Sequence, residues 1–314
     1  MAAPHTLTPA DGPARSHGSP SPLLAYLLMA LVCMVWGSTW LVIKFGLADL
    51  PPLTAAGVRI VAAGLLMAAL APWLARREGG GRAPWLVVTA QGLSQFAFNY
   101  GVVYYAESLL PSGLVSVLWA CFPLMIALGG RWFSGSERLT PGQWIGCVVA
   151  LLGVVLLFVT DIASVGPKAL GVAVLLLLAP ASVAISTLLI KHRAAGASSV
   201  LLNRDSMLLG GAVLVLSALL LEHDAPQRWT PVALGSVVYL TLLGTVFTFG
   251  VYIWLLRHLP AYHLSLTSYI VPVLALLFGA AFGGEPLTLT TLAGTGLVIG
   301  GVSLTLRSKR PELG

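Results

Sequence analysis

The chain has 314 residues, of which 57% are hydrophobic and only 9% are charged, and its formal net charge is +6. An average soluble domain carries about 25% charged residues, so this composition excludes an ordinary soluble domain and predicts an integral membrane protein. The basic residues stand mainly at the ends of apolar stretches. The net charge therefore informs on membrane orientation and gives no reason to expect a nucleic-acid partner.

Apolar stretches follow one another along almost the whole chain. A bilayer core about 30 Å thick requires about 20 mostly apolar residues per helix, and ten stretches qualify, near residues 23–46, 53–75, 85–106, 112–132, 142–160, 169–190, 200–221, 232–256, 262–282 and 287–306. No stretch alternates at period two, which argues against a β-barrel. We predict an all-α membrane protein with ten transmembrane helices, a disordered cytoplasmic tail at residues 1–21 and a cytoplasmic tail at residues 308–314.

Basic residues are distributed unevenly between the two sides of this arrangement. With the N-terminus inside, the cytoplasmic side carries Arg15, Arg76, Arg77, Arg82, Arg131, Arg138, Lys191, Arg193, Arg257, Arg307, Lys309 and Arg310. The outer side carries Lys44, Lys168 and Arg228. Because short cytoplasmic loops are enriched in Lys and Arg, we expect both termini in the cytoplasm.

The second half of the sequence repeats the first. When Pro111–Phe158 is laid over Pro260–Leu306, the matched pairs include Pro111 and Pro260, Pro123 and Pro272, Glu137 and Glu285, and Gly146 and Gly294. The predicted domains are two five-helix repeats at residues 22–160 and 169–307. Each repeat crosses the membrane an odd number of times, so the two copies would have opposite orientations, as in transporters that work by alternating access.

Short motifs recur at characteristic places along the chain. They are Val35-Trp36-Gly37-Ser38-Thr39-Trp40 with Lys44, Arg59, Leu110-Pro111-Ser112-Gly113, the Glu-x-Leu-Thr turns at Glu137 and Glu285, and Tyr269-x-x-Pro272-Val273-x-Ala275. Together they resemble the EamA-type transporters of the drug/metabolite transporter superfamily. The resemblance covers nearly the whole chain and implies ten helices with both ends inside, and export of small metabolites such as amino acids or their analogues.

Polar residues form stripes within four of the apolar stretches. The stripes are Gln91, Gln95 and Asn99 in the third, Ser112, Ser116 and Trp119 in the fourth, Thr241, Thr245, Thr248 and Tyr252 in the eighth, and Ser265, Ser268 and Tyr269 in the ninth. Polar groups in a bilayer are costly unless they face the bundle interior or a wet cavity, so we expect the stripes to converge on one cavity. The alternative is that Ser and Thr merely bond helix backbones. The residues predicted to bind substrate are Trp36, Thr39, Arg59, Gln95, Asn99, Tyr100, Trp119, Thr248, Tyr252, Ser268 and Tyr269.

Charged residues within the apolar stretches have competing interpretations. Arg59 lies about two turns, or roughly 9 Å, inside the second stretch; it would either meet a substrate carboxylate bidentately or snorkel outward. Glu285 precedes Pro286 at a helix start, and Glu137 stands at the equivalent place, so both are interpreted as structural turn elements. We expect Glu107, at the end of the third stretch, to be interfacial. The first stretch contains no carboxylate, which differs from the coupling glutamate of the small four-helix multidrug relatives.

Proline and glycine positions predict kinks and close helix contacts. Pro123 and Pro272 are predicted hinges, because proline inside a helix produces a kink; static kinks are the alternative. Gly142-xxx-Gly146-xxx-Ala150 and Gly296-xxx-Gly300 favour close approach of helices within the chain, with a homodimer face as the alternative. No cysteine pair has metal-ligand spacing and no GxxxxGK[ST] sequence occurs, so no metal site and no cofactor are predicted.

These observations favour a secondary transporter that exports amino acids or similar small metabolites by alternating access. Transport of sugars, nucleotide-linked solutes or organic cations is the alternative. An intramembrane enzyme is disfavoured, because the sequence has no GxSG, no deep His and no paired Asp. The Arg and Ala/Gly/Leu bias hints at a GC-rich genome and a bacterial inner membrane. The expected partners are a small-molecule substrate and the lipid bilayer.

Overall fold

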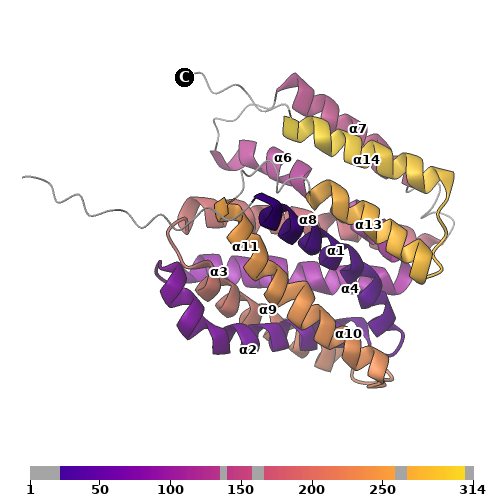
Figure 1. Ribbon diagram of the computed structural model, residues 1–314. Coiled ribbons are helices and arrows are strands. Elements are labelled where there is room, and N and C mark those ends of the chain that lie inside the picture. The colour runs from indigo at the N-terminus through magenta and orange to yellow at the C-terminus, as the bar shows by residue number, and fades with distance from the viewer. Residues whose placement is uncertain (1–21, 135–139, 158–165, 259–266, 308–314) are drawn as a thin grey trace, which may run out of the picture.

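The computed structural model describes residues 22–134, 140–157, 166–258 and 267–307, and within them it is helical apart from turns and one isolated bridge between Gly81 and Ala197. The helices, shown in Figure 1, are α1 (Pro22–Leu47), α2 (Pro52–Glu78), α3 (Trp85–Gln91), η1 (Gly92–Asn99), α4 (Tyr100–Leu109), α5 (Ser112–Trp119), α6 (Phe122–Ser134), α7 (Pro141–Leu157), α8 (Pro167–Arg193), α9 (Ser199–Leu221), α10 (Pro231–Thr241), η4 (Leu242–Phe247), α11 (Thr248–His258), α13 (Thr267–Phe282) and α14 (Leu289–Arg307).

Helical structure is present within every apolar stretch that the sequence analysis identified. Five helices of the described chain are long and apolar enough to cross a membrane, and they span Leu23–Leu47, Pro52–Glu78, Leu170–Arg193, Ser199–Leu221 and Pro231–Tyr252. Shorter apolar helices cover Ser112–Ile126, Pro141–Leu157, Thr267–Phe282 and Leu289–Thr305. The all-helical membrane class is therefore confirmed. The predicted tails at residues 1–21 and 308–314 lie outside the described residues.

Helices α2 and α9 form an antiparallel pair whose ends cap each other. Glu78 at the end of α2 accepts hydrogen bonds from the Ser198 hydroxyl (2.6 Å) and from the backbone N–H of Val200 (3.1 Å) at the start of α9. Glu222 after α9 accepts from the backbone N–H groups of Leu53 and Thr54, both at 2.8 Å, at the start of α2. A carboxylate at a helix N-terminus satisfies free N–H groups and is favoured by the helix dipole. The two helices are thus fastened at both ends.

Helices α7 and α14 form a second antiparallel pair, at one edge of the molecule (Figure 1). Glycines bring the two backbones together: a Cβ on Gly153 would lie 2.7 Å from the carbonyl oxygen of Gly294, and one on Gly301 would clash with the α7 backbone. The contact therefore uses glycines seven residues apart on α14. This corrects the predicted Gly296-xxx-Gly300 stripe, because both of its glycines face open space.

A π-helical turn interrupts each of two long helical segments. In the first, η1 separates α3 from α4, and in the second η4 separates α10 from α11. The two turns lie at matching positions of the sequence repeat, in which Asn99 is aligned with Thr248. Wide π-helical turns occur frequently at functional sites, and both of these turns border the cavity described below.

The predicted fourth span is not one continuous helix. It is divided into α5 and α6 by a turn at Ala120 and Cys121. Pro123 explains the break, because it has no N–H to donate to the carbonyl of Trp119 and its ring crowds the preceding turn. Pro272, at the matching position of the repeat, lies inside the uninterrupted helix α13.

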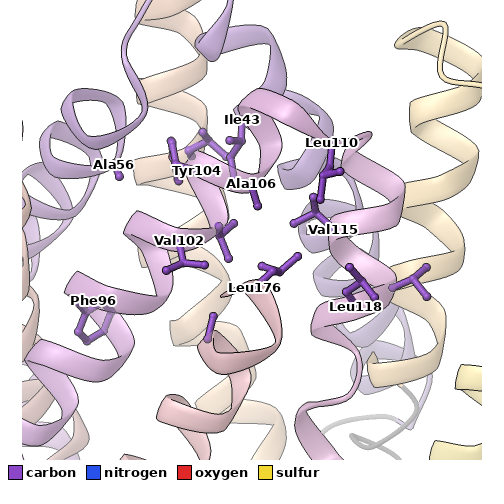
Figure 2. Close-up of a cluster of buried hydrophobic side chains, with 14 of the residues drawn as sticks. Ile43, Ala56, Phe96, Val102, Tyr104, Ala106, Leu110, Val115, Leu118 and Leu176 are labelled. Carbon is purple, nitrogen blue, oxygen red and sulfur yellow. The ribbon is translucent and has the colours of Figure 1, made fainter. Parts of the chain in front are cut away.

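Helix α1 runs through the middle of the bundle and packs against α13, α10, α11, α4 and α5 (Figure 1). The main apolar core lies beside it, between α4, α5 and α8. Figure 2 shows Tyr104, Leu110, Leu118 and Leu176 among its members, all of them nearly or fully buried. Close packing of these side chains holds α4, α5 and α8 in fixed positions beside α1.

Candidate functional site: a central cavity

A cavity of about 440 Å³ lies between the helices, and all four predicted stripes reach it. Most of the residues predicted to bind substrate line it: Trp36, Thr39, Arg59, Gln95, Asn99, Tyr100, Trp119, Tyr252 and Ser268. Both predicted hinge residues, Pro123 and Pro272, also lie in its wall. Ser265 lies outside the described residues. The geometry thus collects the candidates in one place.

Two of the predicted residues are not part of the cavity wall. Thr248 is fully buried and lies behind Trp36, whose indole Nε1–H donates to the Thr248 hydroxyl at 3.0 Å. Tyr269 packs against the main apolar core instead of the cavity. Both residues sit next to lining positions, Phe249 and Ser268.

Among the described residues that line the cavity, Arg59 is the one cation, and only 3% of its surface is exposed. Its Nη1 donates to the Tyr104 hydroxyl at 3.2 Å, and its Nε and Nη2 donate to the Thr245 hydroxyl at 3.3 and 3.2 Å. The guanidinium carbon lies 4.9 Å from the centre of the Tyr100 ring, within the range of a cation–π contact. Arg59 therefore points into the bundle, and the outward snorkelling alternative is wrong.

No ion pair between Arg59 and a carboxylate occurs in the described part of the chain. A guanidinium has five N–H donors, and one N–H on each terminal nitrogen donates to no group among the described residues. A buried cation is costly unless it is paired. The side chain is therefore held in position with its charge uncompensated and with donors left over.

A close approach of η4 brings the neighbours of Arg59 together. A Cβ on Gly244 would lie 2.9 Å from Cγ2 of Thr39 and 3.5 Å from Nη2 of Arg59. Only glycine allows the π-helical turn to lie this near to α1 and α2. The same turn carries Thr245, the main acceptor for the guanidinium.

One wall of the cavity is built around Trp119. Its indole Nε1–H donates to Oδ1 of Asn99 at 2.8 Å, and the Asn99 amide donates to the backbone carbonyl of Gln95 at 3.4 Å. The Trp119 ring stacks on Phe122 with centroids 5.2 Å apart and lies 6.5 Å from the ring of Trp40. The polar stripe of the third segment thus sets the position of an aromatic surface.

A second aromatic surface faces the cavity from α1 and α11. The Trp36 ring lies 5.3 Å from Tyr252 and 6.3 Å from Phe249. Rings at these distances can interact with one another and offer an apolar surface with a few polar edges. The cavity therefore combines aromatic walls with one fixed cation.

Several lining residues had not been predicted as substrate-binding. They are Trp40, Ile43, Gln91, Phe96, Val103, Ser116, Ala120, Phe122, Val183, Thr187, Gly244, Phe249, Thr267 and Val271. Gln91 and Ser116 belong to the predicted stripes, and Trp40 lies in the motif of the first span. Helix α8 contributes Val183 and Thr187, which no sequence pattern indicated. Val183 is apolar, and the Thr187 hydroxyl donates to the Val183 carbonyl of its own helix at 2.8 Å, so both residues are ordinary for a membrane helix.

The two glutamates near the far end of α4 differ from what was expected. Glu107 was predicted to be interfacial, yet it is fully buried, and both of its carboxylate oxygens are without a hydrogen-bond partner. Glu285 is structural, as predicted, but it does not cap its own helix. It accepts from the backbone N–H groups of Ser112 (2.7 Å) and Gly113 (3.1 Å) at the start of α5.

The groups that line the cavity are of kinds that can bind a solute. Among the described residues no group of three or more His, Cys, Asp or Glu side chains is placed to hold a metal ion. The three cysteines are free, and Cys33 and Cys121 are buried. The cavity walls are aromatic, aliphatic and amide groups with Arg59, which can hold an amphipathic solute with an anionic group.

Comparison with known proteins gives a consistent result over nearly the whole chain. A family model described as the EamA-like transporter family matches twice, at residues 23–159 and 170–307. The uncharacterized transporter YoaV of Bacillus subtilis is 26% identical over 86% of this chain and 92% of its own length. The uncharacterized inner membrane transporter YedA of Escherichia coli K12 is 28% identical over 88% of each chain.

Two further similarities concern a named relative and a solved structure. A probable amino-acid metabolite efflux pump of Salmonella typhimurium is 32% identical over 89% of this chain and 93% of its own length. A protein of known crystal structure superposes with a TM-score of 0.65 at 21% identity, with 93% of this chain and 100% of the other covered. At that identity the superposition shows a shared fold.

Proposed function

Because the chain belongs to the EamA-like transporter family, we propose that it is a secondary transporter that exports amino acids or similar small carboxylated metabolites by alternating access. The substrate occupies the central cavity. Family membership indicates a transporter rather than an enzyme. We propose that solute gradients or the proton gradient drive the flux.

In the proposed architecture the chain crosses the membrane ten times, as two five-helix repeats in opposite orientations with both termini in the cytoplasm. The antiparallel pairs support it, because α2 pairs with its repeat equivalent α9 and α7 pairs with its equivalent α14. The matching π-helical turns η1 and η4 support it as well. In this arrangement the cavity lies at the interface of the repeats, where alternating-access transporters hold their substrates. Pro123 and Pro272 are the proposed hinges in its wall.

The observation that carries the substrate class is the unpaired Arg59 in the cavity wall. A guanidinium with free donors recognises a carboxylate through charge-assisted hydrogen bonds. A volume of about 440 Å³ falls within the range of small-molecule sites, and the rings of Trp36 and Trp119 suit an apolar side chain. Positive charge in the wall disfavours organic cations.

The relatives support the direction and the place of transport. The Salmonella typhimurium relative carries the name of an efflux pump for amino-acid metabolites, and the Escherichia coli relative that of an inner membrane transporter. We therefore propose export across a bacterial inner membrane. Sugars, nucleotide-linked solutes and organic cations remain the alternative substrates.

Counterflow in liposomes tests the proposal. Purified full-length protein is reconstituted, the liposomes are loaded with unlabelled solute, and entry of labelled solute is followed for a panel led by neutral and aromatic amino acids. Saturable exchange of a carboxylated member is expected. Exchange of only sugars or organic cations, or flux that stays linear with concentration, would contradict the proposed class or the carrier mechanism.

Substitution of Arg59 tests whether its side chain binds the carboxylate of the substrate. A hydrogen bond to a charged group contributes about 1.5–3 kcal/mol, so Arg59→Gln should weaken the apparent affinity for the substrate by roughly 10- to 100-fold. Arg204→Gln is the matched control, because Arg204 lies on α9, outside the cavity wall, and pairs with its neighbour Asp205 at 2.7 Å. Size-exclusion profiles of both variants check folding. The assignment fails if Arg59→Gln exchanges the carboxylate as wild type does.

A further inference from the structure

The polar stripe of the third helical segment does not end at the cavity. Gln91, Gln95, Asn99 and Val103 line the cavity at intervals of four residues, and Glu107 is the next position of the same stripe. Its side chain is fully buried at the end of α4. The carboxyl group therefore stands just beyond one end of the binding site, under cover of the surrounding helices.

Glu107 differs from the other glutamates near helix ends. Glu78, Glu222 and Glu285 each accept hydrogen bonds from backbone N–H groups at the start of another helix. Glu107 makes no such bond, and both of its oxygens are buried without a hydrogen-bond partner. A capping role is thus excluded by the geometry, and a carboxyl group at this place needs another explanation.

Charged and titratable groups of several helices interact with Glu107. Lys44 on α1, Glu285 beyond α13 and Arg59 on α2 interact with its carboxyl group electrostatically, and so does Tyr104 one turn earlier on α4. Lys44 is already engaged, because its Nζ donates to the carbonyl of Leu110 at 2.6 Å and lies 3.9 Å from Glu285.

Helix α8 also packs against α4, and Lys168 at its start is exposed. Arg59 is joined to the same helix as Glu107 through its bond to Tyr104. Of the two cations that interact with Glu107, Lys44 is paired with Glu285, whereas Arg59 forms no ion pair among the described residues.

Burial and charge together determine what this carboxyl group can do. An ionised carboxylate without hydrogen-bond donors is strongly disfavoured in apolar surroundings, whereas the neutral acid is tolerated. With Glu107 neutral, the charge of Arg59 is free to attract an anion in the cavity. With Glu107 ionised, the two charges offset each other and an anion is attracted less. Binding of a proton and binding of an anion are thus mutually favourable, and linkage makes this effect reciprocal.

We propose that Glu107 is a proton-binding site linked to Arg59, so that a proton and the carboxylate of the substrate are bound and carried together. The linkage rests on the proposed function, whereas the proton site itself rests only on the surroundings of Glu107. Efflux of an accumulated carboxylated metabolite would then carry a proton in the same direction. No residue of the first span is needed for this coupling.

The proton site is tested without any substrate by infrared spectroscopy of the reconstituted full-length protein. A protonated carboxylic acid absorbs separately from an ionised carboxylate. Wild type should show this band near neutral pH, and raising the pH should remove it.

Glu107→Gln should lack the band and Glu222→Gln, the matched change at a capping glutamate, should keep it. Glu107→Leu, of similar size and apolar, provides a second variant if the amide impairs folding. A band that persists in both Glu107 variants, or its absence in wild type, overturns the proton site.

The linkage is tested by counterflow of labelled phenylalanine at a series of pH values. Because loss of the proton weakens anion binding, the apparent affinity should fall by up to about tenfold per pH unit as the pH rises through the titration of Glu107. In Glu107→Gln this slope should vanish, and comparison of the two proteins cancels any titration of phenylalanine itself. A pH-independent wild type overturns the linkage. The infrared band together with no phenylalanine exchange at any pH leaves the proton site standing and counts against the proposed substrate.

Discussion

At the scale of single residues, the cavity is positioned by bonds that run between helices. Arg59 on α2 is held by Tyr104 on α4 and by Thr245 in η4. Each of the two tryptophans that form the aromatic walls donates its indole N–H to a residue on another helix, which fixes the plane of the ring. These hydrogen bonds matter because a side chain whose rotamer is already fixed loses less conformational entropy when the ligand binds.

Loss of the hydrogen bond between Trp36 and Thr248 should weaken substrate binding. Thr248→Val keeps the shape of the side chain and removes the acceptor for the Trp36 indole, which lies 3.0 Å away. A hydrogen bond contributes about 0.5–1.5 kcal/mol, so the apparent affinity in counterflow should fall roughly two- to tenfold. The maximal rate should change less.

A double-mutant cycle separates this positioning effect from a general loss of packing. Trp36→Phe has no indole N–H, so adding Thr248→Val to it should have little further effect. Ser217→Ala is the control, since that hydroxyl bonds only the Val213 carbonyl of its own helix, at 2.8 Å. If Thr248→Val weakens affinity equally in the Trp36→Phe background, the bond does not position the ring.

At the scale of helices, the α7 and α14 pair depends on glycines on one face only. Gly301→Ala would drive a methyl group into the α7 backbone, whereas Gly300→Ala places it in open space. Overpacking costs about 1–3 kcal/mol, while alanine is favoured over glycine in a helix by about 1 kcal/mol. Thermal unfolding in detergent should therefore show a lower Tm for Gly301→Ala and an unchanged or higher Tm for Gly300→Ala. Equal effects of these adjacent substitutions would mean that the two backbones are not in contact.

The places of the helices could be predicted from the sequence, because long apolar stretches have few alternatives in a membrane. The face that a helix turns to its neighbour could not be predicted for every helix. The glycine contact was assigned to Gly296 and Gly300 because their spacing of four is typical of close pairs, yet the spacing of seven is used. Tyr269 was assigned to the polar stripe of the ninth stretch, yet its side chain packs against the apolar core.

The burial of Glu107 shows a related difficulty. A carboxylate at the end of an apolar stretch is expected near water, since position along one helix is all that the sequence provides. The structure buries it because other parts of the bundle cover the end of α4. In contrast, the Gln95 and Asn99 stripe was placed correctly, because amides four residues apart must share a face and cannot be left in lipid.

At the scale of the whole molecule, the antiparallel pairs suggest how the two halves work together. Helices α2 and α9 are fastened at both ends by Glu78 and Glu222, so they would move as one unit. The pair formed by α7 and α14 packs closely at the edge of the molecule (Figure 1). The cavity is lined mainly by helices outside both pairs, together with Arg59 of α2. If the repeats are inverted, an exchange of conformations between them would open the cavity first to one side and then to the other.

Opposite orientation of the repeats can be tested at a matched pair of loops. Arg82 lies between α2 and α3, and Asp224 lies in the equivalent connection between α9 and α10; both residues are exposed. A membrane-impermeant maleimide should label Asp224→Cys in intact spheroplasts and label Arg82→Cys only after permeabilisation. Native Cys33 and Cys121 are buried and Cys147 is partly exposed, so the unmodified protein is labelled in parallel to give the background. Repeats in the same orientation would place both loops on one side and give both variants the same pattern, whereas a reversed pattern would place the termini outside. If only Asp224→Cys is labelled in intact spheroplasts, the two repeats have opposite orientations. Alternating access between inverted halves is then the mechanism that agrees with the cavity, the sequence repeat and the distribution of basic residues.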